Sequence, residues 1–184
     1  MGLNHRLFAS IADFQGSGLP DIPTCLVLDV RLPGRSGLDL QRDLAAASIR
    51  LPIVFITGYG DIPMTVQAMK GGALEFLTKP FRDQDLLDAV NVGLARDRAR
   101  RENEEAVNAL RARYEQLTPR ERAILIQVAQ GQLNKQIAGE MGITETTVKV
   151  HRSNMMRKMQ AASLAKLLRM VDMLKLPPEN SKPS

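Results

Sequence analysis

The sequence predicts an α/β domain with an open parallel sheet, a long linker helix and then an all-α domain. Three observations indicate this. The first half alternates short apolar runs with amphipathic stretches, the second half shows helical patterns alone, and 184 residues suffice for two small domains. We expect a first domain at residues 1–95, a helical linker at 96–114, a second domain at 115–176 and a disordered tail at 177–184.

Three apolar runs in the first half are rich in Val, Leu and Ile, as is typical of strands buried in a parallel sheet. These runs are CLVLDV (25–30), PIVFIT (52–57) and LEFLT (74–78). An amphipathic stretch follows each of them and predicts a helix. The predicted helices cover residues 36–47, 62–70 and 84 onward. This alternation is that of a parallel sheet with crossover helices.

Polar side chains lie where the three predicted strands end. Asp29 ends the first, Thr57 ends the second and Lys79 follows the third. Because the carboxyl ends of parallel strands meet at one edge, we expect these groups to converge. The carboxylate could attack phosphorus, while the ammonium and hydroxyl would stabilise the phosphoryl oxygens. A surface ion pair of Asp29 with Lys79 beside a strand-capping threonine explains the same residues.

The segments CLVLDVRLPGRSGLDL and PIVFITGYGDIPMTVQAMKGGALEFLTKPF, within residues 25–81, resemble the CheY-like (flavodoxin-like) receiver domain of two-component response regulators. The resemblance implies that Asp29 accepts a phosphoryl group from a sensor histidine kinase. It also implies that Thr57, Phe76 and Lys79 form the receiver switch, with a cis peptide bond before Pro80. A core aromatic is the simpler explanation of Phe76.

The family pattern also includes a first strand ending in two acidic residues, which hold Mg²⁺, and a first helix. Residues 5–14 (HRLFASIADF) instead resemble the end of the second strand and the helix after it, so we expect a truncated receiver. Asp29 would then be a weak, incomplete Mg²⁺ ligand, and phosphorylation would be slow or lost. The regulator either no longer depends on phosphate or belongs to a longer protein.

Charge differs between the halves. Residues 1–95 carry 8 Lys and Arg against 10 Asp and Glu, and residues 112–184 carry 12 against 6. The basic half suits a polyanion, although a solvated basic surface would show the same excess. The helix predicted between the halves, at residues 86–117, has apolar residues at 3, 4, 3 spacing. This seam indicates either a coiled-coil contact or one face of a solvated linker helix, and comprises Val107, Leu110, Tyr114 and Leu117.

The second half begins with LTPRER, in which Thr118 can cap a helix, Pro119 suits its first turn and Glu121 can complete a capping box. Helices are predicted at residues 119–130, 134–141, 144–159 and 163–174. The second and third are joined by a tight turn at Gly142, and the third is basic. This pattern is typical of a helix-turn-helix unit.

The third of these helices divides by its period into two faces. The face predicted to be buried comprises Val148, His151, Met155 and Met159, which makes His151 a packed, hydrogen-bonded residue. The opposite face would point into a DNA major groove and comprises Lys149, Val150, Ser153 and Arg157. A solvated charged face is the alternative.

Residues 117–174, and above all NKQIAGEMGITETTVKVHRSNMMRKM, resemble the LuxR-type DNA-binding domain of the FixJ/NarL class. The resemblance implies that Lys149, Val150 and Ser153 face the bases, and that Arg152 and Asn154 lie near the DNA backbone. It also implies a homodimer through the fourth helix. The residues concerned are Leu164, Leu167, Leu168 and Val171.

We therefore expect a transcriptional regulator of a two-component phosphorelay that binds double-stranded DNA, with RNA polymerase as a candidate partner. The alternative is a signalling module that pairs with a kinase or full-length regulator without specific DNA readout. An enzyme is disfavoured because neither histidine is placed with a nucleophile and no Gly-rich phosphate loop occurs. The sequence contains no apolar run long enough for a membrane span and no signal peptide, so we expect a cytoplasmic protein.

Overall fold

The structure is a computed structural model that describes residues 2–58 and 62–176. The tail predicted at residues 177–184 lies outside the described residues. The chain forms two compact units, Met1–Glu102 and Asn103–Ser184. No helix in the described parts of the chain combines the length and the apolar character needed to span a membrane.

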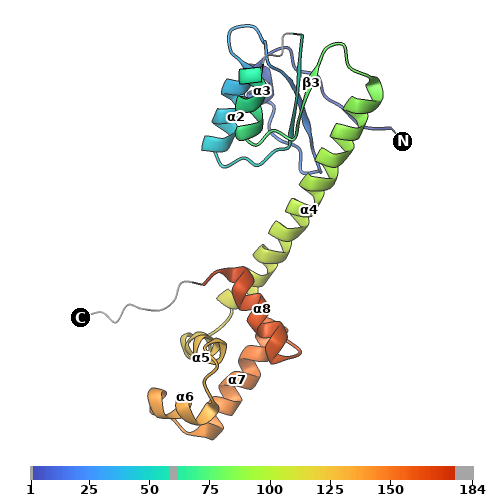
Figure 1. The fold of residues 1–184 in the computed structure, drawn as a ribbon. Helices are drawn as coiled ribbons and strands as arrows, with labels where there is room; N and C mark the ends of the chain where they lie inside the picture. The colour runs from blue at the N-terminus through green and yellow to red at the C-terminus, as the bar shows by residue number, and fades with distance from the viewer. Residues whose placement is uncertain (1, 59–61, 177–184) are drawn as a thin grey trace, which may run out of the picture. The chain divides into compact units, whose positions relative to one another are not determined.

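The N-terminal unit contains a three-stranded parallel sheet in the order β1-β2-β3, which confirms the predicted architecture. The strands are β1 (Leu26–Asp29), β2 (Ile53–Thr57) and β3 (Glu75–Thr78). Helices α2 and α3 cover one face of the sheet and α4 lies against the other (Figure 1). The helices of this unit are α1 (Ile11–Gly16), α2 (Gly37–Ala46), α3 (Ile62–Lys70) and the first part of α4 (Asp83–Glu115).

The segment before β1 differs from the expectation. No strand forms at residues 5–10, and the first element is α1, which is capped by Ser10. The Ser10 side chain accepts a hydrogen bond from the Asp13 backbone N–H at 3.1 Å. Ile11 is buried in the core of this unit, with Phe14 packed against it. Ile11 and Phe14 therefore contact the core from a short helix, whereas Leu7 before it is exposed.

The core of the N-terminal unit lies mainly between the sheet and α2. Phe55 of β2 is fully buried in this core, and Leu40 of α2 is 1% exposed. A capping box starts α2, because the Ser36 hydroxyl accepts from the first turn and the Asp39 carboxylate accepts from the Ser36 N–H. The cap fixes where α2 begins, directly after the loop that follows Asp29.

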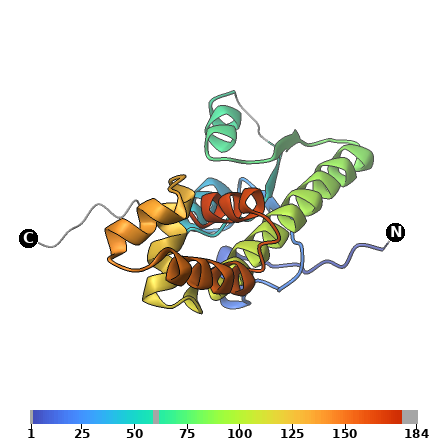
Figure 2. The ribbon, with the colours of Figure 1, turned by 90° about the horizontal axis from the view of Figure 1, so that it is seen from below.

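The C-terminal unit is helical (Figure 2). It has its own hydrophobic core. Beyond the end of α4 it comprises α5 (Pro119–Ala129), α6 (Asn134–Met141), α7 (Glu145–Met159) and α8 (Leu164–Leu174). The predicted capping box of Thr118 and Glu121 is confirmed. Gly142 ends α6 with a φ of 62°, a conformation that favours glycine, so the tight turn before α7 has a local cause.

Three of the four residues of the apolar seam pack inside this unit. Leu110 and Leu117 are 4% and 3% exposed and belong to the core that α5, α7 and α8 share, with Tyr114 packed against it. Neither earlier explanation of the seam, a coiled-coil contact or a solvated helix face, fits these residues. The periodicity identified the buried face correctly but not the surface that covers it.

Candidate functional site

Asp29 and Lys79 meet at the carboxyl edge of the sheet, as the strand ends predicted. The Lys79 ammonium donates to Asp29 Oδ2 at 2.9 Å, and the backbone N–H of Arg31 donates to Oδ1 at 2.9 Å. Thr57 ends the neighbouring strand with no exposed surface, and its carbonyl accepts from the Lys79 N–H at 2.7 Å. The three strand ends therefore present a carboxylate and an ammonium beside a buried hydroxyl.

The electrostatics favour an ionised Asp29. Partial burial raises the pKa of its carboxyl, but hydrogen bonds from Lys79 and Arg31 together lower the pKa by more than burial raises it. The pKa of Asp29 therefore lies below the ordinary 3.8. The side chain of Asp29 is 27% exposed and that of Lys79 is 45% exposed. A charged, accessible carboxylate is available as a nucleophile at neutral pH.

Phe76 lies opposite Phe55 in the register of β2 and β3. Their ring centroids are 6.2 Å apart, and Phe76 packs against the core while remaining half-buried. The Lys79–Pro80 peptide bond is cis, as the resemblance implied. The contacts of Phe76 agree with a core aromatic and leave its part in a switch as a prediction.

Gly37 brings α2 against the strand end that carries Asp29. A Cβ at this position would lie 2.4 Å from the Asp29 carbonyl oxygen and 3.0 Å from Leu28 Cγ. No side chain fits that space without moving the backbone on one side. The close approach holds the start of α2 directly against the backbone at the end of β1.

Gly37→Ala is therefore expected to destabilise the N-terminal unit by about 1–3 kcal/mol, the usual cost of overpacking. Urea denaturation followed by circular dichroism measures this change. Gly139→Ala is the control, because Gly139 lies inside α6 and its Cβ would meet no atom within 4 Å. That variant should gain up to about 1 kcal/mol from helix propensity. Equal stability of the two variants would contradict the steric argument.

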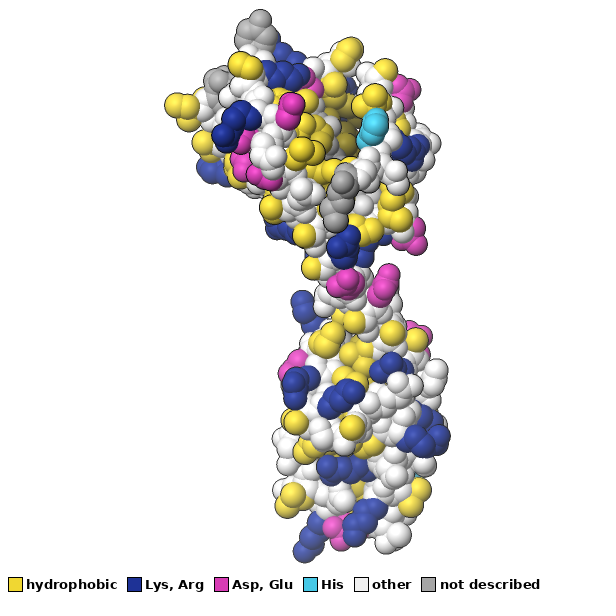
Figure 3. Space-filling model, turned by 90° about the vertical axis from the view of Figure 1, so that its right-hand side faces the viewer, with side chains coloured by type: hydrophobic (Ala, Val, Ile, Leu, Met, Phe, Trp, Pro, Cys, Tyr) yellow, Lys and Arg dark blue, Asp and Glu magenta, His cyan; other side chains and the backbone are white. Residues whose placement is uncertain are grey.

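The candidate DNA-binding face lies on α7. Lys149, Val150, Ser153 and Arg157 are exposed, and Val150 retains 54% of its surface. The opposite face is packed, with Val148, Met155 and Met159 fully buried. Figure 3 shows Lys and Arg side chains across one side of the C-terminal unit, with few acidic ones among them. The exposure of this face agrees with the helical period and leaves its role in DNA binding as a prediction.

Three other side chains of α7 are less accessible than that face. Arg152 is half-buried and donates to the Asn134 side chain at 2.9 Å, so it ties α7 to the start of α6. Asn154 is also half-buried. His151 is half-buried, which agrees with a partly packed residue and leaves its hydrogen bonding as a prediction.

Two carboxylates are buried in ion pairs that the sequence did not predict. Asp97 falls in the predicted helical linker but is fully buried in the N-terminal unit. It accepts from the Thr24 N–H at 2.9 Å and pairs with Arg100 and Arg101 at 2.6 and 2.9 Å. Burial, and to a smaller extent the nearby Asp97 carboxylate, raise the pKa of the half-buried Cys25 thiol to about 11. The thiol is therefore protonated at neutral pH. The only signal in the sequence was the i, i+3, i+4 spacing of the charges.

The second buried carboxylate is Glu121, which is 3% exposed. The Lys158 ammonium donates to Glu121 Oε2 at 2.7 Å and to the Gln116 carbonyl at 3.2 Å. The capping box indicated a role for Glu121 at the start of α5 but gave no sign of its partner. This contact joins the end of α7 to the segment between α4 and α5.

The family matches cover both the region around Asp29 and the region that contains α7. Residues 11–91 match the family described as "Response regulator receiver domain", and residues 115–171 match "Bacterial regulatory proteins, luxR family". Nodulation protein W of Bradyrhizobium diazoefficiens is 55% identical over 95% of this chain and 77% of its own length. Response regulator protein TmoT of Ectopseudomonas mendocina is 47% identical over 95% and 80% of the two chains.

Solved structures agree with these matches. Response regulator StyR superposes with a TM-score of 0.79 at 50% identity, over 90% of this chain and 83% of that one. Full-length FixJ from B. japonicum gives a TM-score of 0.50 at 37% identity, over 92% and 84% of the chains. The protein belongs to the two-component response regulators that carry a LuxR-type DNA-binding domain.

Receiver domains use Mg²⁺ for phosphoryl transfer, so the fit of the site to this ion can be tested. Within residues 2–58 and 62–176 no group of three His, Cys, Asp or Glu side chains could hold a metal ion. Both oxygens of Asp29 already accept hydrogen bonds. Mg²⁺ requires near-octahedral oxygen ligands. The residues that the structure describes bring together no such group of three, so on their own they do not form a complete site for the ion.

Proposed function

We propose that this regulator binds a specific DNA sequence through the exposed face of α7, with Asp29 as its phosphoacceptor. The observation that carries the first part is the division of α7 into a packed face and an exposed face. Lys149 can donate to guanine O6 or N7, Val150 can pack on a thymine methyl and Ser153 can bond either base pair. Arg157 at the margin suits a phosphate, and Arg152 and Asn134 together would orient the edge of this face.

The chemistry at Asp29 would be direct attack on phosphorus. One carboxylate oxygen forms the new bond to phosphorus while the bond to the donor's leaving group breaks, and the leaving group takes the electron pair. Lys79 already lies beside the carboxylate and would follow the charge onto the phosphoryl oxygens. We propose that Thr57 donates a hydrogen bond to the same group and that Phe76 responds to this movement. The donor would be a sensor histidine kinase.

We also propose that this chain is phosphorylated poorly and acts on DNA largely without phosphate. Support comes from the surroundings of Asp29, since the described residues bring together no group of three His, Cys, Asp or Glu side chains, and the ion needs several oxygen ligands. A homodimer through α8 is part of the proposal. Leu164 is 41% exposed and Leu168 and Val171 are half-buried, whereas Leu167 is fully buried in the unit's own core and is unavailable to a partner.

Selection of binding sites from random DNA tests the proposal directly. We expect enrichment of a two-fold symmetric sequence, because each α7 of a dimer would read one half-site. Failure to enrich any sequence, together with stable binding to a kinase or a full-length relative, would instead support an interaction module without DNA readout.

Affinity for the selected DNA site should change less than about threefold when acetyl phosphate and Mg²⁺ are added. The reason is that an incomplete Mg²⁺ site would allow little phosphorylation of Asp29. Asp29→Asn is the matched control and should behave as the unmodified protein does. The C-terminal unit alone should bind similarly, provided that it begins at Asn103, since a later start would remove the core residue Leu110. A gain of about tenfold, equivalent to about 1.4 kcal/mol, would contradict the proposal.

A further inference from the structure

We propose that the N-terminal unit binds a small organic anion, a carboxylate or phosphate on an apolar body, in a cavity at the amino end of β2. The cavity measures about 540 Å³, within the range of small-molecule sites. It is distinct from the Asp29 site, because Ile53 and Pro52 at the start of β2 line it, whereas Asp29 lies at the carboxyl end of β1.

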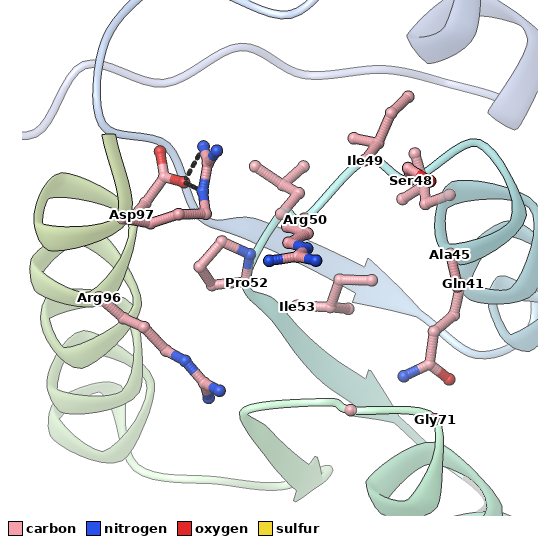
Figure 4. A pocket seen from close by; sticks show the side chains of 14 residues that line it. Gln41, Ala45, Ser48, Ile49, Arg50, Pro52, Ile53, Gly71, Arg96 and Asp97 are labelled. Carbon is pink, nitrogen blue, oxygen red and sulfur yellow. Dashed lines mark hydrogen bonds and ion pairs between the residues drawn. The ribbon is translucent and has the colours of Figure 1, made fainter. Parts of the chain in front are cut away.

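The cavity has an apolar floor and walls from separate segments. The second half of α2 and the loop after it form one side, Gly71 and Gly72 form another, and α4 closes a third (Figure 4). The apolar side chains are Leu44, Ala45, Ile49, Leu51, Pro52 and Ile53. Such a floor would favour a ligand with a hydrocarbon or aromatic part, because contact removes apolar surface from water.

The charged groups at the cavity are mostly positive. Three arginines line it, Arg50, Arg96 and Arg100, against a single acid, Asp97. The Asp97 carboxylate is engaged by Arg100, by Arg101 and by a backbone N–H. No ion pair within the described residues involves Arg50 or Arg96, and both are exposed. The cavity therefore carries positive charge that its own walls do not neutralise.

Figure 4 shows that the two arginines come from different elements, Arg96 from α4 and Arg50 from the loop before β2. A planar guanidinium donates two parallel hydrogen bonds to a carboxylate or phosphate, so an anion between them could be held from two directions. A hollow with an apolar floor suits a compact ligand, whereas a nucleic acid would meet these arginines only from outside. The combination of charge and floor points to an organic anion.

Calorimetric titration of the full chain tests this site with four compounds: phenylphosphonate, benzoate, inorganic phosphate and benzyl alcohol. Phenylphosphonate cannot donate a phosphoryl group to Asp29, so no covalent product complicates the titration. We expect phenylphosphonate and benzoate to bind saturably, each about tenfold more tightly than inorganic phosphate, and benzyl alcohol not to bind. Asp29→Asn should leave phenylphosphonate binding unchanged.

Three variants locate the site. Arg50→Gln and Arg96→Gln should each weaken phenylphosphonate binding about tenfold, the usual scale of a charge-assisted hydrogen bond. Arg98→Gln is the matched control, because Arg98 is exposed on the same helix and does not line the cavity. All three residues are exposed, so the substitutions should leave folding intact.

Four results would overturn the proposal. The first is the absence of saturable binding by either organic anion, and the second is equal affinity for inorganic phosphate. The third is an equal loss in Arg98→Gln, which would indicate a general effect of net charge. The fourth is weaker DNA binding in Arg50→Gln and Arg96→Gln with unchanged phenylphosphonate binding, which would assign these arginines to nucleic acid.

Discussion

Lys158→Met is expected to lower the free energy of unfolding of the C-terminal unit by about 2–3 kcal/mol, because it leaves a buried carboxylate without its cation. Glu121 is 3% exposed and Lys158 Nζ is 2.7 Å from its Oε2. The same ammonium also bonds the Gln116 carbonyl, which loses its partner in the variant. The loss lies below that of a fully buried pair because the Lys158 side chain is 25% exposed.

The deficit should depend on pH in a defined direction. Burial raises the pKa of the Glu121 carboxyl, but hydrogen bonds from Lys158 and from the Thr118 N–H lower it below the ordinary 4.5. This group therefore stabilises the folded protein above about pH 4.5 and less as the pH falls through its lowered pKa. In Lys158→Met the carboxyl can protonate more easily, so the difference between the two proteins should shrink below pH 4.5.

Urea denaturation of a chain that begins at Asn103, followed by circular dichroism at pH 7 and pH 4, measures both effects. Arg157→Met is the control, since Arg157 is exposed on the same turn of α7 and should change stability by less than about 0.5 kcal/mol. The double variant Glu121→Gln/Lys158→Met should lose less than the sum of the single losses. Additive losses, or a deficit that does not vary with pH, would contradict the proposed ion pair.

Local signals explain why much of the fold followed from the sequence. Thr118, Pro119 and Glu121 formed the expected helix start, and Gly142 ended α6 where its left-handed backbone was required. The apolar runs formed parallel strands because both faces of the sheet are covered, and the strand ends placed Asp29 and Lys79 together. These features depend on neighbours in the sequence or on one rule of sheet geometry.

The remaining features depend on pairs that are distant in the sequence. Asp97 contacts Thr24, and Glu121 contacts Lys158, across separations that no periodicity encodes. Arg152 turned toward Asn134 for the same reason, although its helical position alone allowed a place near DNA. The apolar seam that includes Leu110 shows a second limit of prediction from sequence. A helical period identifies which face of a helix is buried, but not which part of the protein covers that face. Charged residues on long helices were therefore the hardest to assign.

The second large effect concerns DNA affinity, which should depend more on Lys149 than on other basic residues of the surface. Lys149→Ala is expected to weaken binding to the selected DNA site by about 1–3 kcal/mol and binding to random DNA much less, because a base contact is lost. Lys149 is exposed on α7 beside Val150. The expected loss of DNA affinity follows if α7 enters the major groove, where Lys149 would reach the bases. Fluorescence anisotropy at several salt concentrations measures both affinities.

Lys166→Ala is the matched control, because it removes the same charge from an exposed position on α8. It should lower both affinities slightly and equally, since a distant lysine acts only through the general field of the protein. A lysine that contacts phosphate would instead weaken both DNAs alike and reduce the slope of log affinity against log salt by about 1. If Lys149→Ala shows that behaviour, Lys149 binds the DNA backbone, and base recognition must come from Val150 and Ser153 alone.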